Sequence, residues 1–271
     1  MNEVSMEKLI NISSIQKSAL NYLKNQPFPH IVVDNFFDES LARRLELDFP
    51  DFDANVWHGY NNPIEVKKLC NSWNAFPSQT FKVFSYLVSN KFAEELSKIL
   101  YKSCVLYPDP GLHGGGWHIH KSGGKLNTHL DYSIHPKLRL QRKLNLIVFL
   151  NSSWSEEWGG KLGLWSNESP DAPGVLVKEI SPKFNRAVIF DTTMNSWHGL
   201  PDPIQCPDGQ YRKSIAVYYL VEPTQNVSDR EKALFAPTDK QRDDKEVLEL
   251  IVKRATSETA SQVYEVGDDS K

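Results

Sequence analysis

The chain has 271 residues, of which 40% are hydrophobic and 24% are charged, and its formal net charge is −3. This composition is ordinary for a globular protein, and the small negative charge gives no electrostatic reason to expect nucleic acid or an anionic membrane as a partner. The first residues lack a basic segment followed by an apolar one, and no run approaches the roughly 18 apolar residues of a membrane span. We therefore expect a cytoplasmic protein with a small or near-neutral ligand.

Mixed helix and strand signals occupy about residues 13–105. Apolar spacing predicts a helix near 15–23, and the stretch FPHIVVDNFF predicts a short strand. Asp38 has the position of an N-cap before LARRLELDF, and two further helical runs lie near 79–101. This part of the chain is expected to support a β core.

From Thr128 the pattern changes to short strands separated by turn-forming segments. The strand candidates are KLNLIVFLN, GKLGLWS, VLVKEISP, RAVIFD and SIAVYYL. Such a series predicts an antiparallel sandwich or barrel. With no linker in the sequence, we expect one domain over 1–271: support over about 1–105, a core over about 106–221, and a charged extension over 222–271 with a helix in KEVLELIVKRA.

Five of the eight histidines lie between residues 113 and 135. Within this window, His129 and Asp131 would point to the same side of a strand, as two ligands of one metal ion would. A polar pair in which Asp131 only orients the His129 ring is the plain alternative. His118 and His120 also have strand spacing, but no glutamate follows them at the short spacing that a cupin-type metal site needs.

A third candidate ligand, His198, follows the strand RAVIFD and a loop. Two histidines and one carboxylate on one face of a metal form the facial triad of non-heme iron(II) oxygenases. Further along, strand alternation places Arg212, Ser214 and Tyr218 on one face. An arginine that faces the inside of a barrel needs an anion, and its guanidinium can hold a carboxylate in bidentate fashion.

Taken together, these motifs resemble the 2-oxoglutarate- and iron(II)-dependent oxygenases, in particular their prolyl-4-hydroxylase-like branch. The resemblance extends from about residue 28 to 221 and rests on five segments: FPHIVVDNFF, THLDYS, RKLNLIVFLNSSWSEEWGGKLGLW, ISPKFNRAVIFDTTMNSWHG and YRKSIAVYYL. It implies a mainly β fold with flanking helices, in which N-terminal helices buttress a double-stranded β-helix, or jelly roll. It also implies that His129, Asp131 and His198 bind iron and that Arg212, helped by Ser214, binds the distal carboxylate of 2-oxoglutarate.

Two positions depart from the family pattern. His120 stands where many relatives have a tyrosine that contacts the cosubstrate, and Phe149 replaces another tyrosine on a later strand. His120 and Asn145 are therefore candidate cosubstrate donors, although His120 could equally be a loop histidine bonded to backbone. Tyr218 and Trp117 are candidates for the substrate channel, whereas Trp197 and Tyr132 are expected to point away from it.

The resemblance implies a hydroxylase that uses Fe(II), 2-oxoglutarate and O2, with ascorbate expected to stimulate it. A prolyl residue of a protein or peptide is the substrate that this branch favours. A free amino acid, sugar or other metabolite is the alternative, because no peptide-binding module is recognisable. A non-catalytic jelly roll that only binds a ligand is a third possibility, against which the intact ligand set and Arg212 argue.

Overall fold

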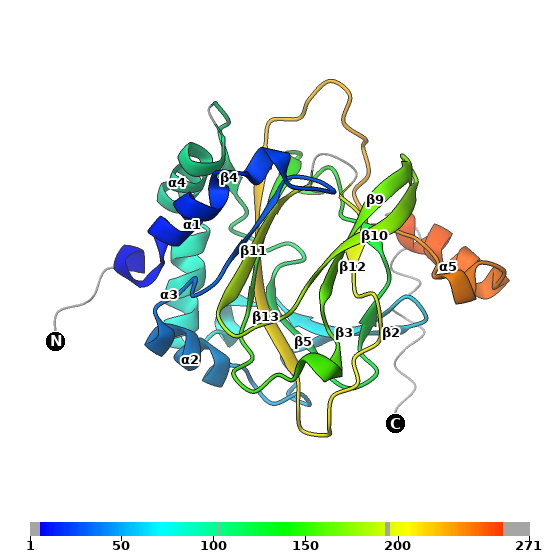
Figure 1. Ribbon diagram of the computed structural model, residues 1–271, viewed down its shortest axis with the longest axis horizontal. Coiled ribbons are helices and arrows are strands. Elements are labelled where there is room, and N and C mark those ends of the chain that lie inside the picture. Colours follow the sequence, from blue (N-terminus) through cyan, green and yellow to red (C-terminus); the bar gives the residue numbers. More distant parts are fainter. Residues whose placement is uncertain (1–5, 102, 193–195, 257–271) are drawn as a thin grey trace.

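The structure of the protein, a computed structural model, describes residues 6–101, 103–192 and 196–256. Two antiparallel sheets face each other with a cavity between them, and helices lie on the outer side of the larger sheet (Figure 1). This is the expected jelly roll with an N-terminal helical buttress, so the predicted fold class is confirmed.

The larger sheet has nine strands in the order β1-β11-β8-β13-β5-β3-β2, with β4 beside β13 and β6 beside β3. Their bounds are β1 His30–Val33, β2 His58–Asn62, β3 Glu65–Cys70, β4 Tyr107–Pro108, β5 Gly116–His120, β6 Lys125–Leu126, β8 Gln141–Phe149, β11 Arg186–Asp191 and β13 Arg212–Val221.

The smaller sheet has five strands in the order β10-β9-β12-β7-β14. Their bounds are β7 His129–Leu130, β9 Leu162–Ser169, β10 Ala172–Ile180, β12 His198–Gly199 and β14 Leu234–Phe235. The α-helices are α1 Ile12–Ala19, α2 Glu39–Leu47, α3 Ser78–Leu87, α4 Asn90–Leu100 and α5 Lys245–Ala255. Short 3-10 helices cover Met6–Leu9, Tyr22–Lys24, Trp73–Ala75, Glu156–Trp158 and Asp239–Gln241. None of the helices in the described part of the chain has the length and apolar character needed to cross a bilayer.

Strand alternation separates the core from the cavity. Leu144, Leu146 and Val148 of β8 are fully buried and belong to the main apolar core, which also contains residues from α1 to α4. The alternate residues Asn145 and Ile147 line the cavity instead. Asp38 caps α2 as expected, because its carboxylate accepts hydrogen bonds from the backbone N–H groups of the first turn.

The extension after β13 packs on the smaller sheet. Its strand β14 pairs with β7, the strand that carries His129. Helix α5, expected in KEVLELIVKRA, buries Val247 and Ile251 against Ile64 and Phe235. Up to residue 256 the extension is therefore part of the fold and packs near the cavity. Residues 257–271 lie outside the described part of the chain.

Candidate active site

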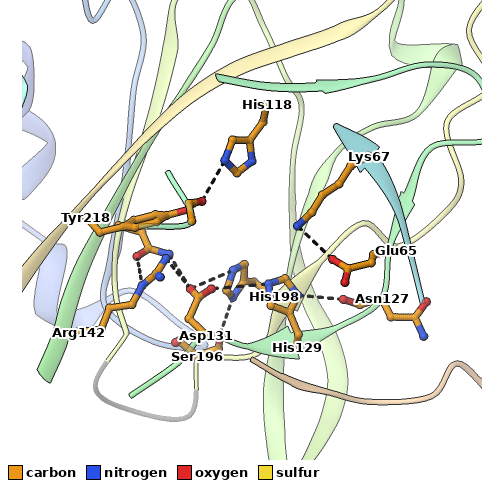
Figure 2. Close-up of polar contacts among 12 residues, drawn as sticks. Glu65, Lys67, His118, Asn127, His129, Asp131, Arg142, Ser196, His198 and Tyr218 are labelled. Atoms are coloured by element: carbon orange, nitrogen blue, oxygen red, sulfur yellow. Dashed lines mark hydrogen bonds and ion pairs between the residues drawn. The ribbon is translucent and has the colours of Figure 1, made fainter. Parts of the chain in front are cut away.

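His129, Asp131 and His198 meet at one side of the cavity between the sheets (Figure 2). One ligand atom from each lies within 4.8 Å of the others. The two histidines are directly opposite each other on the paired strands β7 and β12. Asp131 places Oδ1 3.8 Å from His129 Nε2 and Oδ2 3.5 Å from His198 Nε2. The chain thus brings together the three residues that the sequence had predicted as ligands.

Both imidazoles are held in the form that a metal requires. His129 Nδ1 lies 2.9 Å from the Asn127 carbonyl and His198 Nδ1 lies 2.8 Å from the Ser196 carbonyl (Figure 2). A carbonyl can only accept, so each Nδ1 carries the proton and each Nε2 offers a lone pair to the centre of the group. Burial lowers the pKa of both histidines, which keeps them neutral at pH 7.

A buried arginine orients the carboxylate of Asp131. Burial by itself would raise the pKa of Asp131, but the positive charge of Arg142 lowers it overall, and the hydrogen bond from Asn145 acts in the same direction. Arg142 lies 3.1 Å from Asp131 Oδ2, and Asn145 Nδ2 donates to the same oxygen at 2.8 Å. Arg142 Nε also donates to Asn145 Oδ1 at 2.8 Å. These contacts hold an ionised carboxylate toward the two histidines.

The donor set therefore fits iron(II), since it offers two neutral imidazole nitrogens and one carboxylate on one side of an open cavity. His118 and His120 line the same cavity, but among the described residues only the triad brings three metal-binding side chains together. His118 Nε2 instead contacts the Gly114 carbonyl at 3.1 Å. The geometry therefore favours a metal site at His129, Asp131 and His198 over one at His118 and His120.

A second polar region of the cavity is built around Arg212. Its side chain is buried, and its Nε donates to the Gly160 carbonyl at 2.6 Å. No carboxylate within the described ranges forms an ion pair with it, and burial lowers its pKa to about 10. A Cβ on Gly160 would lie 2.9 Å from Arg212 Cδ, which explains why the turn before β9 contains a glycine at this point. A buried cation in this position requires an anionic ligand.

His120 lies beside Arg212, because the two residues are paired between β5 and β13. His120 is buried, and neither ring nitrogen has a hydrogen-bond partner among the described residues. Burial lowers its pKa well below the usual value, so the ring is neutral and carries one N–H donor. Ser214, two residues beyond Arg212, lines the same wall. These three side chains form a pocket suited to a carboxylate.

The remaining candidate residues, Tyr218, Asn145 and Trp197, differ in how they lie relative to the cavity. Tyr218 lines the cavity as expected, and Arg142 Cζ lies 3.4 Å from the centre of its ring. Asn145 also faces the cavity, but its amide is engaged by Asp131 and Arg142, which favours a role in orienting the metal ligand over the expected contact with cosubstrate. Trp197 is fully buried in a separate apolar cluster, as expected.

Two aromatic assignments need correction. Trp117 was expected in the channel, but it is fully buried in the main core, 4.9 Å from the ring centre of Phe76. The reason is alternation along β5: His118 and His120 face the cavity, so Trp117 faces the helices. Tyr132 was expected to point away, but it lines the cavity because β7 ends at Leu130 and regular alternation stops there.

If His120 contacts the cosubstrate, replacing it with phenylalanine should weaken 2-oxoglutarate binding by about 1 to 3 kcal/mol, the usual cost of an unpaired buried polar partner. The fold and the bound iron should be retained. Iron analysis combined with an anaerobic 2-oxoglutarate titration measures both effects. His129→Ala serves as the opposite case, since it should lose iron. Iron loss in His120→Phe with iron retention in His129→Ala would instead place the metal at the His118/His120 pair.

Comparisons with known proteins agree with this geometry. Residues 115–220 match the 2OG-Fe(II) oxygenase superfamily. Prolyl 3-hydroxylase OGFOD1 of Xenopus laevis is 26% identical over 204 residues, which cover 73% of this chain and 36% of that protein. The chain therefore spans little more than a third of this curated relative.

Solved structures show the same fold. A prolyl-4-hydroxylase from Pseudomonas putida superposes with a TM-score of 0.55 at 15% identity, covering 77% of this chain and 100% of that one. A prolyl hydroxylase from Trichoplax adhaerens, solved with a peptide fragment of hypoxia inducible factor, gives 0.53 at 17% identity, covering 81% and 94%. The segment that matches the superfamily contains His129, Asp131, His198 and Arg212. The segment that carries the triad and Arg212 thus matches the 2OG-Fe(II) oxygenase superfamily, and the chain resembles a prolyl 3-hydroxylase in sequence and prolyl hydroxylases in fold.

Proposed function

We propose that the chain hydroxylates an unactivated C–H bond of its substrate, and that this substrate is a prolyl residue in a protein or peptide. Iron(II) bound by His129, Asp131 and His198 would supply oxidative chemistry in which the substrate C–H bond, O2 and 2-oxoglutarate give the alcohol, succinate and CO2. The prolyl substrate is supported by the relative and the structural neighbours, whose names describe prolyl hydroxylases.

The observation that carries the proposal is the buried Arg212, which has no carboxylate partner within the described ranges although it faces the same cavity as the triad. 2-Oxoglutarate has a carboxylate at each end. One end can therefore pair with Arg212 while the other end faces the metal site formed by the triad. The guanidinium gives bidentate hydrogen bonds, and Ser214 and His120 offer further donors. The pocket around Arg212 would therefore fix the orientation of the cosubstrate.

The chain's residues have separate tasks in this reaction. Arg142 and Asn145 hold Asp131 in its ionised form and in a fixed direction. The backbone carbonyls of Asn127 and Ser196 fix the two imidazoles. The apolar residues Ile147 and Leu162 line the cavity near these groups and limit access of water to the reacting atoms.

A mass-spectrometric screen tests the proposal. Purified protein with iron(II), 2-oxoglutarate and ascorbate is incubated with proline-containing peptides and with free amino acids and sugars. We expect a product with one added oxygen atom whose formation requires iron, 2-oxoglutarate and O2. Ascorbate should increase the yield. Failure to convert 2-oxoglutarate to succinate in every mixture would refute the proposal and favour a non-catalytic ligand-binding protein.

A further inference from the structure

Lys67 is a largely buried lysine in the wall of the cavity. It lies on β3, and its side chain is 14% exposed and lines the cavity. The antiparallel register of β3 against β5 pairs Lys68 with Ile119. The next position along this register places Lys67 opposite His120, which also lines the cavity. Lys67 therefore adjoins the pocket in which the cosubstrate is expected to bind.

Three neighbouring strands carry a row of polar side chains along this wall. Arg212 of β13 pairs with His120 of β5, and Lys67 of β3 lies on the far side of His120. Side chains at opposed positions of adjacent strands have Cβ atoms about 5 Å apart. His120 is buried, and neither of its ring nitrogens has a hydrogen-bond partner among the described residues. The row thus consists of two cations on either side of an unpartnered histidine, and it suits an anionic ligand.

The ammonium group of Lys67 can still donate hydrogen bonds to such a ligand. Its Nζ lies 3.4 Å from Glu65 Oε2 (Figure 2) and 5.1 Å from the centre of the Tyr60 ring. The distance to Glu65 is too long for a good hydrogen bond, and Glu65 Oε2 has no hydrogen-bond partner among the described residues. Because an ammonium has three donors, these contacts leave donors for a ligand carboxylate.

The part of the chain that carries Lys67 is joined to the segment that carries a metal ligand. Asn127, two residues before His129, donates its backbone N–H to the Ile64 carbonyl at 2.8 Å, just before β3 begins. Electrostatics agree with this closeness: burial lowers the pKa of His129 and His198, and the positive charge of Lys67 lowers both further. Lys67 therefore lies at the end of the row that faces the triad.

We propose that Lys67 binds the carboxylate of 2-oxoglutarate that adjoins the 2-oxo group, while Arg212 binds the carboxylate at the other end. This inference rests on the proposed function and adds a second cation to the cosubstrate pocket. 2-Oxoglutarate is a dianion, and the row offers one cation to each end with the His120 ring between them. A carboxylate has two oxygens, so one can face Lys67 while the other faces the metal site.

Glu65 positions the ammonium group before the cosubstrate binds. The Glu65 side chain is fully buried. Its second oxygen, Oε1, lies 3.1 Å from Arg254 Nε, so the carboxylate is held in one direction beside Lys67. A lysine that is already directed by its neighbour loses less conformational entropy when it binds a ligand. Glu65 is thus a positioning residue, and Lys67 is the residue that contacts the cosubstrate.

Two ligands and two variants test which end of the cosubstrate Lys67 binds. 2-Oxopentanoate has the same 2-oxo acid end as 2-oxoglutarate but a methyl group in place of the distal carboxylate. Lys67→Met removes the charge and keeps much of the apolar stem, and Arg212→Ala removes the cation at the other end of the row. Lys68→Met is the control, since Lys68 points to the other side of β3, where its Nζ donates to the Phe52 carbonyl at 2.7 Å.

Each iron-loaded protein is titrated anaerobically with each ligand, and the visible metal-to-ligand charge-transfer band gives the dissociation constant. Lys67→Met should raise the dissociation constants of both ligands about 10- to 100-fold, the loss of one or two charge-assisted hydrogen bonds. Arg212→Ala should raise the dissociation constant of 2-oxoglutarate only. Lys68→Met should change neither value, and metal analysis should find the same iron content in all variants.

Unchanged affinity of Lys67→Met for both ligands would overturn the inference. A loss confined to 2-oxoglutarate would also overturn it, because Lys67 would then bind the distal carboxylate beside Arg212. The same holds if Lys67→Met loses iron, or if the unmodified protein binds 2-oxoglutarate but not 2-oxopentanoate. Should urea unfolding show that Lys67→Met is not folded, Lys67→Gln, which keeps a donor toward Glu65 without the charge, carries the same expectations. If the unmodified protein gives no band with 2-oxoglutarate, the proposed function itself fails.

Discussion

Replacing Asp131 with alanine is expected to abolish iron binding and also to destabilise the folded protein. The site would lose its only anionic protein ligand, so purified protein should contain almost no iron after desalting, and no turnover should remain. In addition, Arg142, whose side chain is 2% exposed, would lose the carboxylate that lies 3.1 Å away. Breaking a buried pair in this way typically costs about 3 to 5 kcal/mol in the free energy of unfolding. Metal analysis and urea unfolding measure the two effects.

The double variant Asp131→Ala, Arg142→Met separates the two causes. Methionine leaves no buried charge between the rings of Tyr132 and Tyr218, so stability should largely recover while iron binding stays lost. Glu39→Ala is a control, because Glu39 forms an exposed pair with Arg43 whose loss should cost at most about 1 kcal/mol. Near-normal iron content in Asp131→Ala would exclude Asp131 as a ligand.

The sequence predicted the order and type of most elements because the apolar periodicity is strong where elements are long. The strands β8, β11 and β13 and the helices α2 to α5 overlap the expected segments, with ends that differ by one or two residues in most cases. The hairpin of β2 and β3 was not predicted, since HGYNN and EVKKLC are polar and only Glu65, Leu69 and Cys70 are buried. Its burial depends on contact with β5, which no local pattern reveals.

The metal ligands and Arg212 could be predicted because they occur as an ordered set in the chain: the pair His129 and Asp131, then His198, then Arg212 at the start of a long strand. The sequence did not predict Arg142 as a site residue, because a bulge interrupts β8. On either side of the bulge, Leu144 pairs with Tyr219 and Arg142 pairs with Leu220. Lys143 between them is an extra residue without a partner position on β13. The bulge places Arg142 and Asn145 on the same side despite a spacing of three. Simple alternation would have put Arg142 in the opposite direction from Asn145.

Lys67 and Arg254, two cations that line the cavity, were not predicted from the sequence for a different reason. They come from parts of the sequence with high charge density, where a lysine or arginine is most often a solvated surface residue. Only the three-dimensional structure shows that both contact the buried Glu65 beside the cavity. Arg254 and Glu65 are 189 residues apart, and an ion pair over such a separation carries no signal in a single sequence.

Replacing Arg212 with alanine should weaken 2-oxoglutarate binding strongly and leave iron binding intact. A buried charge that pairs with a ligand carboxylate typically contributes about 2 to 5 kcal/mol, so the dissociation constant should rise by roughly 30-fold or more. The triad does not contact Arg212 in any described interaction, and its histidines remain oriented by the carbonyls of Asn127 and Ser196. An anaerobic titration of iron-loaded protein, followed by the visible metal-to-ligand charge-transfer band, gives the affinity directly.

Lys213 provides the matched control for Arg212, because it is the next residue of β13 and points to the opposite side, where its Nζ donates to the Glu46 carbonyl at 3.3 Å. Lys213→Ala should therefore bind 2-oxoglutarate normally. Arg212→Lys should bind more weakly than the unmodified protein and more tightly than Arg212→Ala, since an ammonium keeps the charge but loses the bidentate geometry. If Arg212→Ala binds normally, the cosubstrate carboxylate must pair with another cation of the cavity, and Lys67→Met, measured in the same titration, would identify it.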